Sequence, residues 1–389
     1  MKKELALITC YFQHNYGSQL QALATEMMCR RMGLDYETIR IDGLRPEINR
    51  AKYKYFLSRI TDIQTVKDKF ATVKKVWAKT TNKQYAKNLA IRDGFFDRFA
   101  EEQFHLSKTY TSKKELGECA RDYSAFIVGS DQLWLPSNIA ADYYTLSYVP
   151  DDVKKIAYAT SFGVANLPRK QAEVARKFLP RFDSIMVREQ SGQRLVKELT
   201  GKDVPIVCDP TMMFSADEWN ELLPTSRRIK ENYILCYFLG DNPWQRKWAK
   251  QLAAKTGNKI VQLPNLDNYI KSDEGFADYP LYDVDPLDFV ALVRDAEYVL
   301  TDSFHCTVFS SLFNKQFFTF RRYSEDGTAS TNSRIYSLLA SLGATDRLVS
   351  VETEVKEAMN LLMYLKSVNA NINKLRYDSY TILIEAIPR

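Results

Sequence analysis

The chain has 389 residues, 45% of them hydrophobic and 26% charged, with a formal charge of +6; this is ordinary globular composition, sufficient for two separate cores. No apolar run approaches the 18 residues needed to cross a bilayer, and the apolar stretch after Lys3 is too short for a secretory signal, so we expect a cytoplasmic protein. The six cysteines form no C-x-x-C pair, which argues against both a zinc site and a disulfide framework.

Apolar, strand-like runs alternate with helical patterns in the first half of the chain. The predicted strands lie within residues 5–11, 35–41, 123–134, 154–163, 184–192 and 204–214. The predicted helices are residues 19–33, 169–179 and 190–199. Strand followed by helix at this rhythm predicts a parallel, doubly wound sheet, with ligands bound at the turns that follow the strands.

A basic segment interrupts this alternation. Residues 45–99 carry fourteen Lys or Arg against five Asp or Glu, so the rest of the chain is slightly acidic. Apolar residues recur in this segment at intervals of mostly three or four positions, which predicts a helical insertion over residues 45–105. These apolar residues are Tyr55, Ile60, Ile63, Val66, Phe70, Val73 and Trp77. A solvated helical face explains the charge, and the alternative is attraction to an anionic membrane surface or lipid-linked glycan. Nucleic acid is not expected, because no binding motif accompanies the charge.

The alternation resumes after Pro210 and defines a second unit. Strands are predicted within residues 232–240, 259–265, 298–303 and 317–322, and helices at 242–257, 286–297 and 305–316. We therefore predict two Rossmann-like domains facing each other across a cleft, residues 1–207 and 208–389. The closing helices, residues 352–365 and 371–386, are candidates to cross back to the first domain.

A polar turn joins the first predicted strand to its helix. It contains His14, Asn15, Tyr16, Gly17 and Ser18. In one interpretation this is an ordinary connection, in which glycine permits the bend and serine caps the helix. In the other, the loop and the helix N-terminus point at a ligand.

A second polar cluster ends the strand in FIVGSDQLW. The strand delivers Gly129, Ser130, Asp131 and Gln132, followed by Trp134. Carboxylate, amide and indole together suit a sugar, whose hydroxyls need hydrogen bonds and whose C–H face stacks on an aromatic ring. The alternative is a capped turn with a core tryptophan.

Arg188 follows another strand, in MVREQSG. An arginine at this place can bind a carboxylate or phosphate through two parallel hydrogen bonds. It can equally pair with Glu189 or another local acid.

The third cluster is VLTDSFHCTVF, in which Asp302 and Ser303 end a strand and His305 starts a helix. The free N–H groups and positive end of such a helix suit an anion. Further cationic and polar residues follow, namely Arg321, Arg322, Asn332, Ser333 and Arg334. Guanidinium groups beside a histidine fit a small substrate that bears phosphate and carboxylate.

These clusters, in this order, resemble the polysaccharide pyruvyl transferase family. The matching stretches are NYGSQLQALA, FIVGSDQLW, MVREQSG, CDPTMMF, TDSFHCTVFSSLFNKQF and the NSR of TNSRIYSLLASLG. The resemblance implies a GT-B-like fold and transfer of pyruvate from phosphoenolpyruvate to two hydroxyls of a surface glycan or its lipid-linked precursor, giving a cyclic ketal. It implies no cofactor and no metal.

The resemblance also implies roles for individual residues. His305 would protonate the donor, Asp131 or Asp302 would accept hydroxyl protons, and Arg188 would bind the donor. Ser303 departs from the arginine of several family members, so Arg321, Arg322 or Arg334 would take its place, or the donor differs. Asn332 and Ser333 join the donor side. The acceptor side would comprise His14, Asn15, Tyr16, Gly17, Ser18, Gln21, Gly129, Ser130, Gln132 and Trp134.

Two other functions are compatible with these residues. One is a GT-B glycosyltransferase that uses a nucleotide sugar, although the sequence offers no recognisable acidic ribose-binding residue. The other is a glycan-binding protein without catalysis. The sequence does not indicate an oligomeric state.

Overall fold

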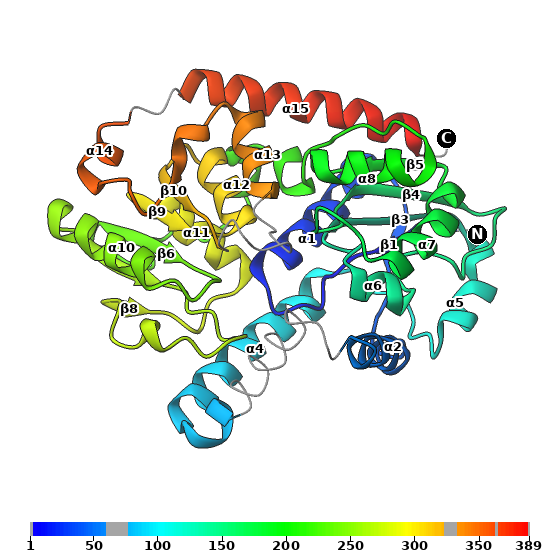
Figure 1. Ribbon diagram of the computed structural model, residues 1–389, viewed down its shortest axis with the longest axis horizontal. Helices are drawn as coiled ribbons and strands as arrows, with labels where there is room; N and C mark the ends of the chain where they lie inside the picture. The colour runs from blue at the N-terminus through cyan, green and yellow to red at the C-terminus, as the bar shows by residue number, and fades with distance from the viewer. Residues whose placement is uncertain (1–2, 60–76, 323–332, 362–364, 388–389) are drawn as a thin grey trace.

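The computed structural model describes residues 3–59, 77–322, 333–361 and 365–387. Within these ranges the chain forms two α/β units, each built on a parallel sheet, which confirms the predicted fold class. Figure 1 shows the first unit around β1, β3 and β4 and the second around β6, β9 and β10.

The first sheet has the strand order β2-β1-β3-β4-β5. Its strands are β1 (Lys3–Ile8), β2 (Tyr36–Thr38), β3 (Tyr123–Asp131), β4 (Lys154–Thr160) and β5 (Ser184–Val187). β3 and β4 are buried almost throughout, as expected of parallel strands covered by helices on both faces. After β1 the chain forms β2 on one side, and after β3 it forms β4 and then β5 on the other side. The strand order therefore reverses between β1 and β3, and α/β sheets bind ligands at the carboxyl ends of strands at such a switch point.

One predicted strand of this sheet is shorter than expected. The apolar run over residues 35–41 forms a strand only at Tyr36–Thr38. The run stays buried at Ile39 and Ile41, but the N–H of Ile41 donates to the Tyr11 hydroxyl instead of a strand partner. Burial, rather than sheet pairing, therefore explains the second half of the apolar pattern.

The helices of the first unit differ in how much of their surface is buried. They are α1 (Tyr16–Arg31), α2 (Arg45–Leu57), α4 (Lys83–Gln103), α5 (Lys113–Glu118), α6 (Pro136–Ala141), α7 (Arg169–Phe178) and α8 (Gln190–Thr200). α7 and α8 bury one face and expose their charged residues. α1 buries 13 of its 16 residues because it lies between the first unit and α11 and α12 of the second.

The second sheet has the strand order β11-β10-β9-β6-β7-β8. Its strands are β6 (Tyr233–Tyr237), β7 (Lys259–Gln262), β8 (Tyr279–Pro280), β9 (Tyr298–Thr301), β10 (Gln316–Phe320) and β11 (Leu348–Val349). The flanking helices are α10 (Pro243–Thr256), α11 (Pro286–Asp295), α12 (Phe304–Leu312), α13 (Ser333–Leu342) and α14 (Val355–Met359). Here the switch point lies between β6 and β9, and the two switch points face each other across α1.

The last helix, α15 (Leu365–Ala386), runs along both units, as Figure 1 shows. Its Arg376 donates to the carbonyls of Met212 and Phe214, and its Ser379 hydroxyl accepts from the N–H of Cys208. These contacts fix the connection between the sheets, which includes α9 (Ala216–Asn220). The predicted helix over residues 352–365 is only the five-residue α14 in the described part of that range.

Two helices of the basic insertion are described, α2 and α4. α2 packs against α6, and α4 reaches the second unit through an ion pair of 2.9 Å between Arg92 and Asp267. Within the predicted apolar stripe, Ile60, Ile63, Val66, Phe70 and Val73 lie outside the described residues. Trp77 is described and is 61% exposed.

Candidate functional site

A cavity of about 250 Å³, here called the central cavity, lies at the two facing switch points. Cys10 and Ser18 reach it after β1, Asp131 at the end of β3, and Leu239 after β6. Ser303 and His305 reach it after β9. Its size is just below the roughly 300–1,000 Å³ typical of pockets for drug-sized ligands, so it suits a small substrate.

His305 lies at the start of α12, which Ser303 caps with its hydroxyl. The imidazole is buried except for the side that faces the central cavity, and its Nε2 is 3.3 Å from Oδ2 of Asp209. On its other side the ring lies against Gly17, where an added Cβ would be 2.0 Å from Nδ1. Position 17 therefore requires glycine, because the His305 ring occupies the space that a side chain at this position would need.

Asp209 is a site residue that sequence reasoning missed. It is fully buried and receives hydrogen bonds from Arg188 (2.6 Å), the Ser130 hydroxyl (3.1 Å) and the Thr211 hydroxyl (2.8 Å). Burial opposes its ionisation, but the neighbouring His305 and Arg188 outweigh burial and hold the pKa of Asp209 below its ordinary range. The residue thus supplies a permanent negative charge beside the histidine. Its signal in the sequence was the CDPT turn after an apolar run, which carried the family resemblance but no assigned role.

Arg188 lies behind the central cavity rather than in its lining. Its guanidinium donates to Asp209 and, at 3.3 Å, to Oδ1 of Asp131, and it stacks on the Phe304 ring at 4.3 Å. Because protein carboxylates occupy both ends of the planar group, this geometry fits a positioning role better than the direct donor contact predicted from the sequence.

Asp131 faces the central cavity and is the acidic residue of its lining. Its Oδ2 accepts from the Ser18 hydroxyl at 2.8 Å, and Arg334 lies 3.9 Å from Oδ1. Burial raises the pKa of this carboxyl, but Arg188, His305 and Arg334 outweigh it and hold the pKa at about 2. Its backbone φ of +81° is uncommon for a residue other than glycine, and such conformations cluster at functional sites. Asp131 is therefore an ionised acceptor placed for a hydroxyl group.

Three cationic side chains line the central cavity: Lys52, Arg322 and Arg334. Burial and the nearby Arg188 lower the pKa of Arg334 to about 10, so it stays protonated at neutral pH. Arg322 is held by the carbonyl of Asp302 at 2.9 Å. Among the described residues of this lining Asp131 is the one acid, so their charges leave an excess of positive charge, which suits a ligand with more than one negative group.

Lys52 is the second residue that sequence reasoning missed. It comes from α2 of the basic insertion, and burial lowers the pKa of its ammonium. Among the described residues it has no ion-pair or hydrogen-bonding partner, so its charge faces the central cavity uncompensated. The sequence placed it in a run of similar lysines, with nothing to distinguish it from the exposed Lys54.

On the predicted acceptor side, Asn15, Ser18 and Gln132 line the central cavity, together with Gln13 and Asn138, which were not predicted. Asn15 also caps α1 by accepting from the N–H of Ser18. These amides and hydroxyls present donors and acceptors without charge, as a sugar requires.

Several predicted acceptor residues instead form the support beneath the cavity. Gln21 bridges the Ser18 carbonyl and the Ser130 N–H, and both Gln21 and Ser130 are fully buried. Gly129 lies in the sheet, where an added Cβ would meet the Tyr158 carbonyl at 1.9 Å. These three residues, predicted to contact the acceptor, do not line the central cavity, because strand and helix backbone cover them.

Trp134 and Tyr16 are also core residues rather than sugar platforms. Trp134 is fully buried, donates to the Tyr144 carbonyl at 3.1 Å, and packs on Phe162. Tyr16 stacks on Phe289 of α11 at 4.7 Å between the two units. Both rings were expected at the ligand because they adjoin polar turns, but the apolar surface of an aromatic ring packs into a core equally well.

His14 and Asp302 have structural partners too. His14 is bound by Asp93 (3.0 Å) and Asp97 (2.7 Å) of α4, and the Asp93 bond foremost raises the pKa of this imidazole. Asp302 is fully buried and accepts from the N–H groups of Leu239 and Gly240 at 2.8 and 2.9 Å. Its predicted role as a proton acceptor was wrong, because both carboxylate oxygens are bound by backbone.

Two further predicted donor residues, Arg321 and Ser333, are described and do not line the central cavity. The Arg321 guanidinium lies 5.8 Å from the centre of the Tyr336 ring, and Ser333 begins α13. Asn332 lies outside the described residues. Within the described ranges, no group of three or more His, Cys, Asp or Glu side chains is placed to hold a metal ion. No helix in the described part of the chain is both long and apolar enough to span a bilayer.

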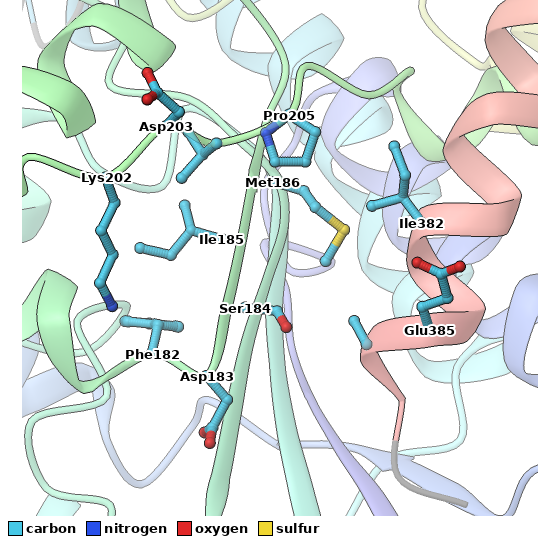
Figure 2. Close-up of a pocket in the computed structure, with 12 residues that line it drawn as sticks. Phe182, Asp183, Ser184, Ile185, Met186, Lys202, Asp203, Pro205, Ile382 and Glu385 are labelled. Atoms are coloured by element: carbon cyan, nitrogen blue, oxygen red, sulfur yellow. The ribbon is translucent and has the colours of Figure 1, made fainter.

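A second cavity, of about 320 Å³, lies far from this chemistry. Figure 2 shows it between β5 and the end of α15, with Met186 facing Ile382. Asp183 and Glu385 lie at its edge. Its described lining has neither a histidine nor a convergent set of cations, so the central cavity is the candidate active site.

Two parallel-sheet α/β units with facing switch points define a GT-B-like fold. The chain is similar in structure to UDP-GlcNAc 2-epimerase from Neisseria meningitidis bound to UDP-GlcNAc, with a TM-score of 0.52, 10% identity and 99% of both chains covered. The wall teichoic acid polymerase TagF gives a TM-score of 0.48 at 9% identity, over 98% of this chain and 88% of that one. At these identities the similarity to the Neisseria enzyme establishes the fold alone.

Family membership follows from the sequence profile of the polysaccharide pyruvyl transferases, which matches residues 15–324. The chain belongs to the polysaccharide pyruvyl transferase family, a family of transferases. The matched range includes Asp131, Arg188, Asp209 and His305. No curated protein matches the chain significantly.

Proposed function

We propose that the protein transfers pyruvate from phosphoenolpyruvate to two hydroxyls of a sugar, in a surface glycan or its lipid-linked precursor, and forms a cyclic ketal. The observation that carries the proposal is the position of His305: it faces a small cavity with three cations, and its Nε2 lies 3.3 Å from Oδ2 of Asp209. Membership of the pyruvyl transferase family supports the same reaction.

The charges of the central cavity support the donor. Phosphoenolpyruvate carries a phosphate and a carboxylate. The cavity lining provides three cations, Lys52, Arg322 and Arg334, which is enough to pair with both anionic groups. Arg322 lies with Ser303 in the same lining, so we assign to Arg322 the charge that an arginine at position 303 supplies in several family members. A neutral or singly charged donor would leave this excess of positive charge unmatched.

The chemistry follows from these positions. His305 protonates the methylene carbon of the donor, and the resulting methyl carbon adjoins an oxocarbenium-like centre. One sugar hydroxyl attacks that centre and gives its proton to Asp131. The carbon–oxygen bond to phosphate then breaks, the second hydroxyl attacks the same carbon, and its proton leaves with the phosphate. One donor and one diol therefore give one ketal and one inorganic phosphate, with Asp131 returning its proton through His305.

We propose that the basic insertion binds the anionic membrane surface that surrounds a lipid-linked acceptor. The charge excess of residues 45–99 supports peripheral contact with an anionic membrane. Co-sedimentation with anionic vesicles should then weaken as salt rises, because exposed charges are screened within about 10 Å at 0.1 M salt. If the protein does not bind these vesicles, or binds them equally at all salt concentrations, the charged residues of the insertion only solvate the surface of a helix.

Phosphate release from phosphoenolpyruvate tests the proposed reaction. The protein is incubated with the donor and a panel of galactosides, mannosides and N-acetylhexosaminides, and phosphate and ketal are measured together. We expect both products in equal amounts with at least one acceptor. Thermal stabilisation by a nucleoside diphosphate, without stabilisation by phosphoenolpyruvate, would favour a nucleotide-sugar glycosyltransferase instead.

A further inference from the structure

A hollow of about 140 Å³, here called the tyrosine hollow, lies between the start of α4 and the loop that follows β7. Three tyrosines line it: Tyr85 from α4, and Tyr269 and Tyr282 from the second unit. The hollow therefore has walls from both units, at the place where the basic insertion meets the second unit.

The aromatic part of the wall has a fixed geometry. Tyr85 is buried, and its hydroxyl donates to the Leu266 carbonyl at 2.8 Å. The rings of Tyr85 and Tyr269 meet edge to face, with centres 5.6 Å apart and planes at 88°. Tyr269 and Tyr282 are half-buried, so each keeps apolar ring surface for a ligand. The C–H face of a pyranose is a suitable partner for such surface.

The polar part of the wall consists mainly of side-chain amides: Asn82, Gln84, Asn88, Asn265 and Asn268. Gln84 donates to Asn88 at 2.8 Å, which uses one of several bonds that each amide can make. Asn268 is exposed, and its side chain has no hydrogen bond within the described part of the chain. Asn82 and Asn265 accept from the backbone N–H groups of Tyr85 and Asp267. The remaining amide donors and acceptors, those of Asn268 above all, match the hydroxyls of an uncharged carbohydrate.

The charges of the wall argue against an anionic ligand. Two carboxylates line the hollow and each has a protein partner: Asp273 accepts from Arg246 at 2.8 Å, and Glu274 from the Tyr269 hydroxyl at 2.5 Å. Among the described residues the lining contains neither lysine nor arginine. A phosphate or nucleotide would meet acidic groups here, in contrast to the cationic central cavity.

The tyrosine hollow and the central cavity are connected through shared neighbours. Asn265 of the hollow donates to the carbonyl of Leu239, which lines the central cavity. On α4, Asn88 of the hollow is about 14 Å from Asp97, which holds His14 beside the central cavity. The carbonyl of Leu239 and helix α4 therefore connect the walls of the two sites.

We propose that the tyrosine hollow binds a second, uncharged sugar residue of the acceptor, so that the acceptor is an oligosaccharide rather than a single sugar. This inference rests on the proposed function, because the central cavity must hold the sugar that receives pyruvate. The hollow then selects acceptors by an interaction remote from the reacting hydroxyls.

Direct binding and turnover together test the proposal. Saturation-transfer NMR and the phosphate assay use mono-, di- and trisaccharides of glucose, galactose, mannose and N-acetylhexosamines. We expect an oligosaccharide to bind more tightly than its monosaccharides. Tyr269→Ala should weaken that binding roughly tenfold, and raise the KM for the oligosaccharide but not for phosphoenolpyruvate. The matched control is Tyr377→Ala, a 73% exposed tyrosine on α15, which should change neither quantity.

Asn268→Ala, in an exposed loop, provides a second variant that does not disturb the core. Oligosaccharide binding that neither variant weakens would overturn the proposal, as would the absence of binding by every sugar in the panel or displacement of the sugar by uridine diphosphate. Sugar binding that depends on Tyr269 without phosphate release would support the hollow and contradict the proposed reaction. Phosphate release with monosaccharides as efficient as with oligosaccharides would support the reaction and contradict the hollow.

Discussion

Nε2 of His305 lies 3.3 Å from Oδ2 of Asp209, and the two residues reach this contact from different units of the protein. His305 begins α12 in the second unit, whereas Asp209 follows Ile206, which is bridged to Val187 of the first sheet. The imidazole of His305 and the carboxylate of Asp209 therefore meet only when the two sheets are brought together.

Asp209→Asn should reduce turnover while the KM for phosphoenolpyruvate stays near the parent value. Asparagine keeps the shape but removes the charge beside the protonated imidazole, and loss of the carboxylate behind a catalytic histidine can cost up to roughly 10⁴-fold. Steady-state kinetics at neutral pH measure the effect, with thermal unfolding to show that the variant is folded. Turnover within about threefold of the parent would show that Asp209 only supports the fold.

Gly17→Ala should impair catalysis without unfolding the protein. The added methyl group would be 2.0 Å from Nδ1 of His305, so the ring must move, and a displacement of about 1 Å can cost about 10²-fold in rate. Gly94→Ala is the matched control, because a Cβ in that part of α4 meets nothing within 4 Å. Equal kinetics for the two variants would contradict the position assigned to His305.

Lys52→Met should weaken donor binding. Loss of a charge-assisted hydrogen bond costs about 1.5–3 kcal/mol, so the KM for phosphoenolpyruvate should rise by roughly tenfold or more. Lys54→Met on the exposed face of the same helix controls for the net charge of the insertion. A rise of the same size in both variants would mean that long-range charge, rather than contact in the cavity, attracts the donor.

Stability should fall in acid partly through Asp131. Its pKa of about 2 in the folded state lies below the ordinary aspartate value of about 3.9, so it contributes stability above about pH 4 that is lost as the pH falls toward 2. The contribution is about 2.5 kcal/mol. Urea unfolding between pH 5 and pH 2 should show a smaller loss in Asp131→Asn than in Asp203→Asn, an exposed control. Parallel curves for the two variants would contradict the low pKa.

The sequence predicted the parts of this site that follow a strand directly. Asp131, Ser303 and His305 were found because parallel sheets gather the ends of their strands, and that rule needs no knowledge of distant contacts. Asp209 lay in the CDPT turn after an apolar run but was given no role, whereas Lys52 was missed for the opposite reason. Lys52 reaches the cavity only because α2 packs against α6, and nothing local in the sequence encodes that contact.

Burial explains the wrong assignments. Trp134 and Asp302 stand beside residues that do line the cavity, and a polar or aromatic residue next to a turn can point inward or outward. For Asp302 the deciding factor is the pair of backbone N–H groups from Leu239 and Gly240, which belong to the neighbouring strand end. Such a contact becomes visible only when the strand order is known.

Turnover of His305→Gln tests the central claim most directly. Glutamine keeps size and hydrogen bonding but cannot transfer a proton at neutral pH, and loss of a general acid typically costs 10²- to 10⁴-fold in rate. We expect phosphate release from phosphoenolpyruvate, measured with the best acceptor of the panel, to fall by about that factor while the protein stays folded and still binds the donor. Phosphate release by a folded His305→Gln protein at more than roughly a tenth of the parent rate would contradict its role as the proton donor.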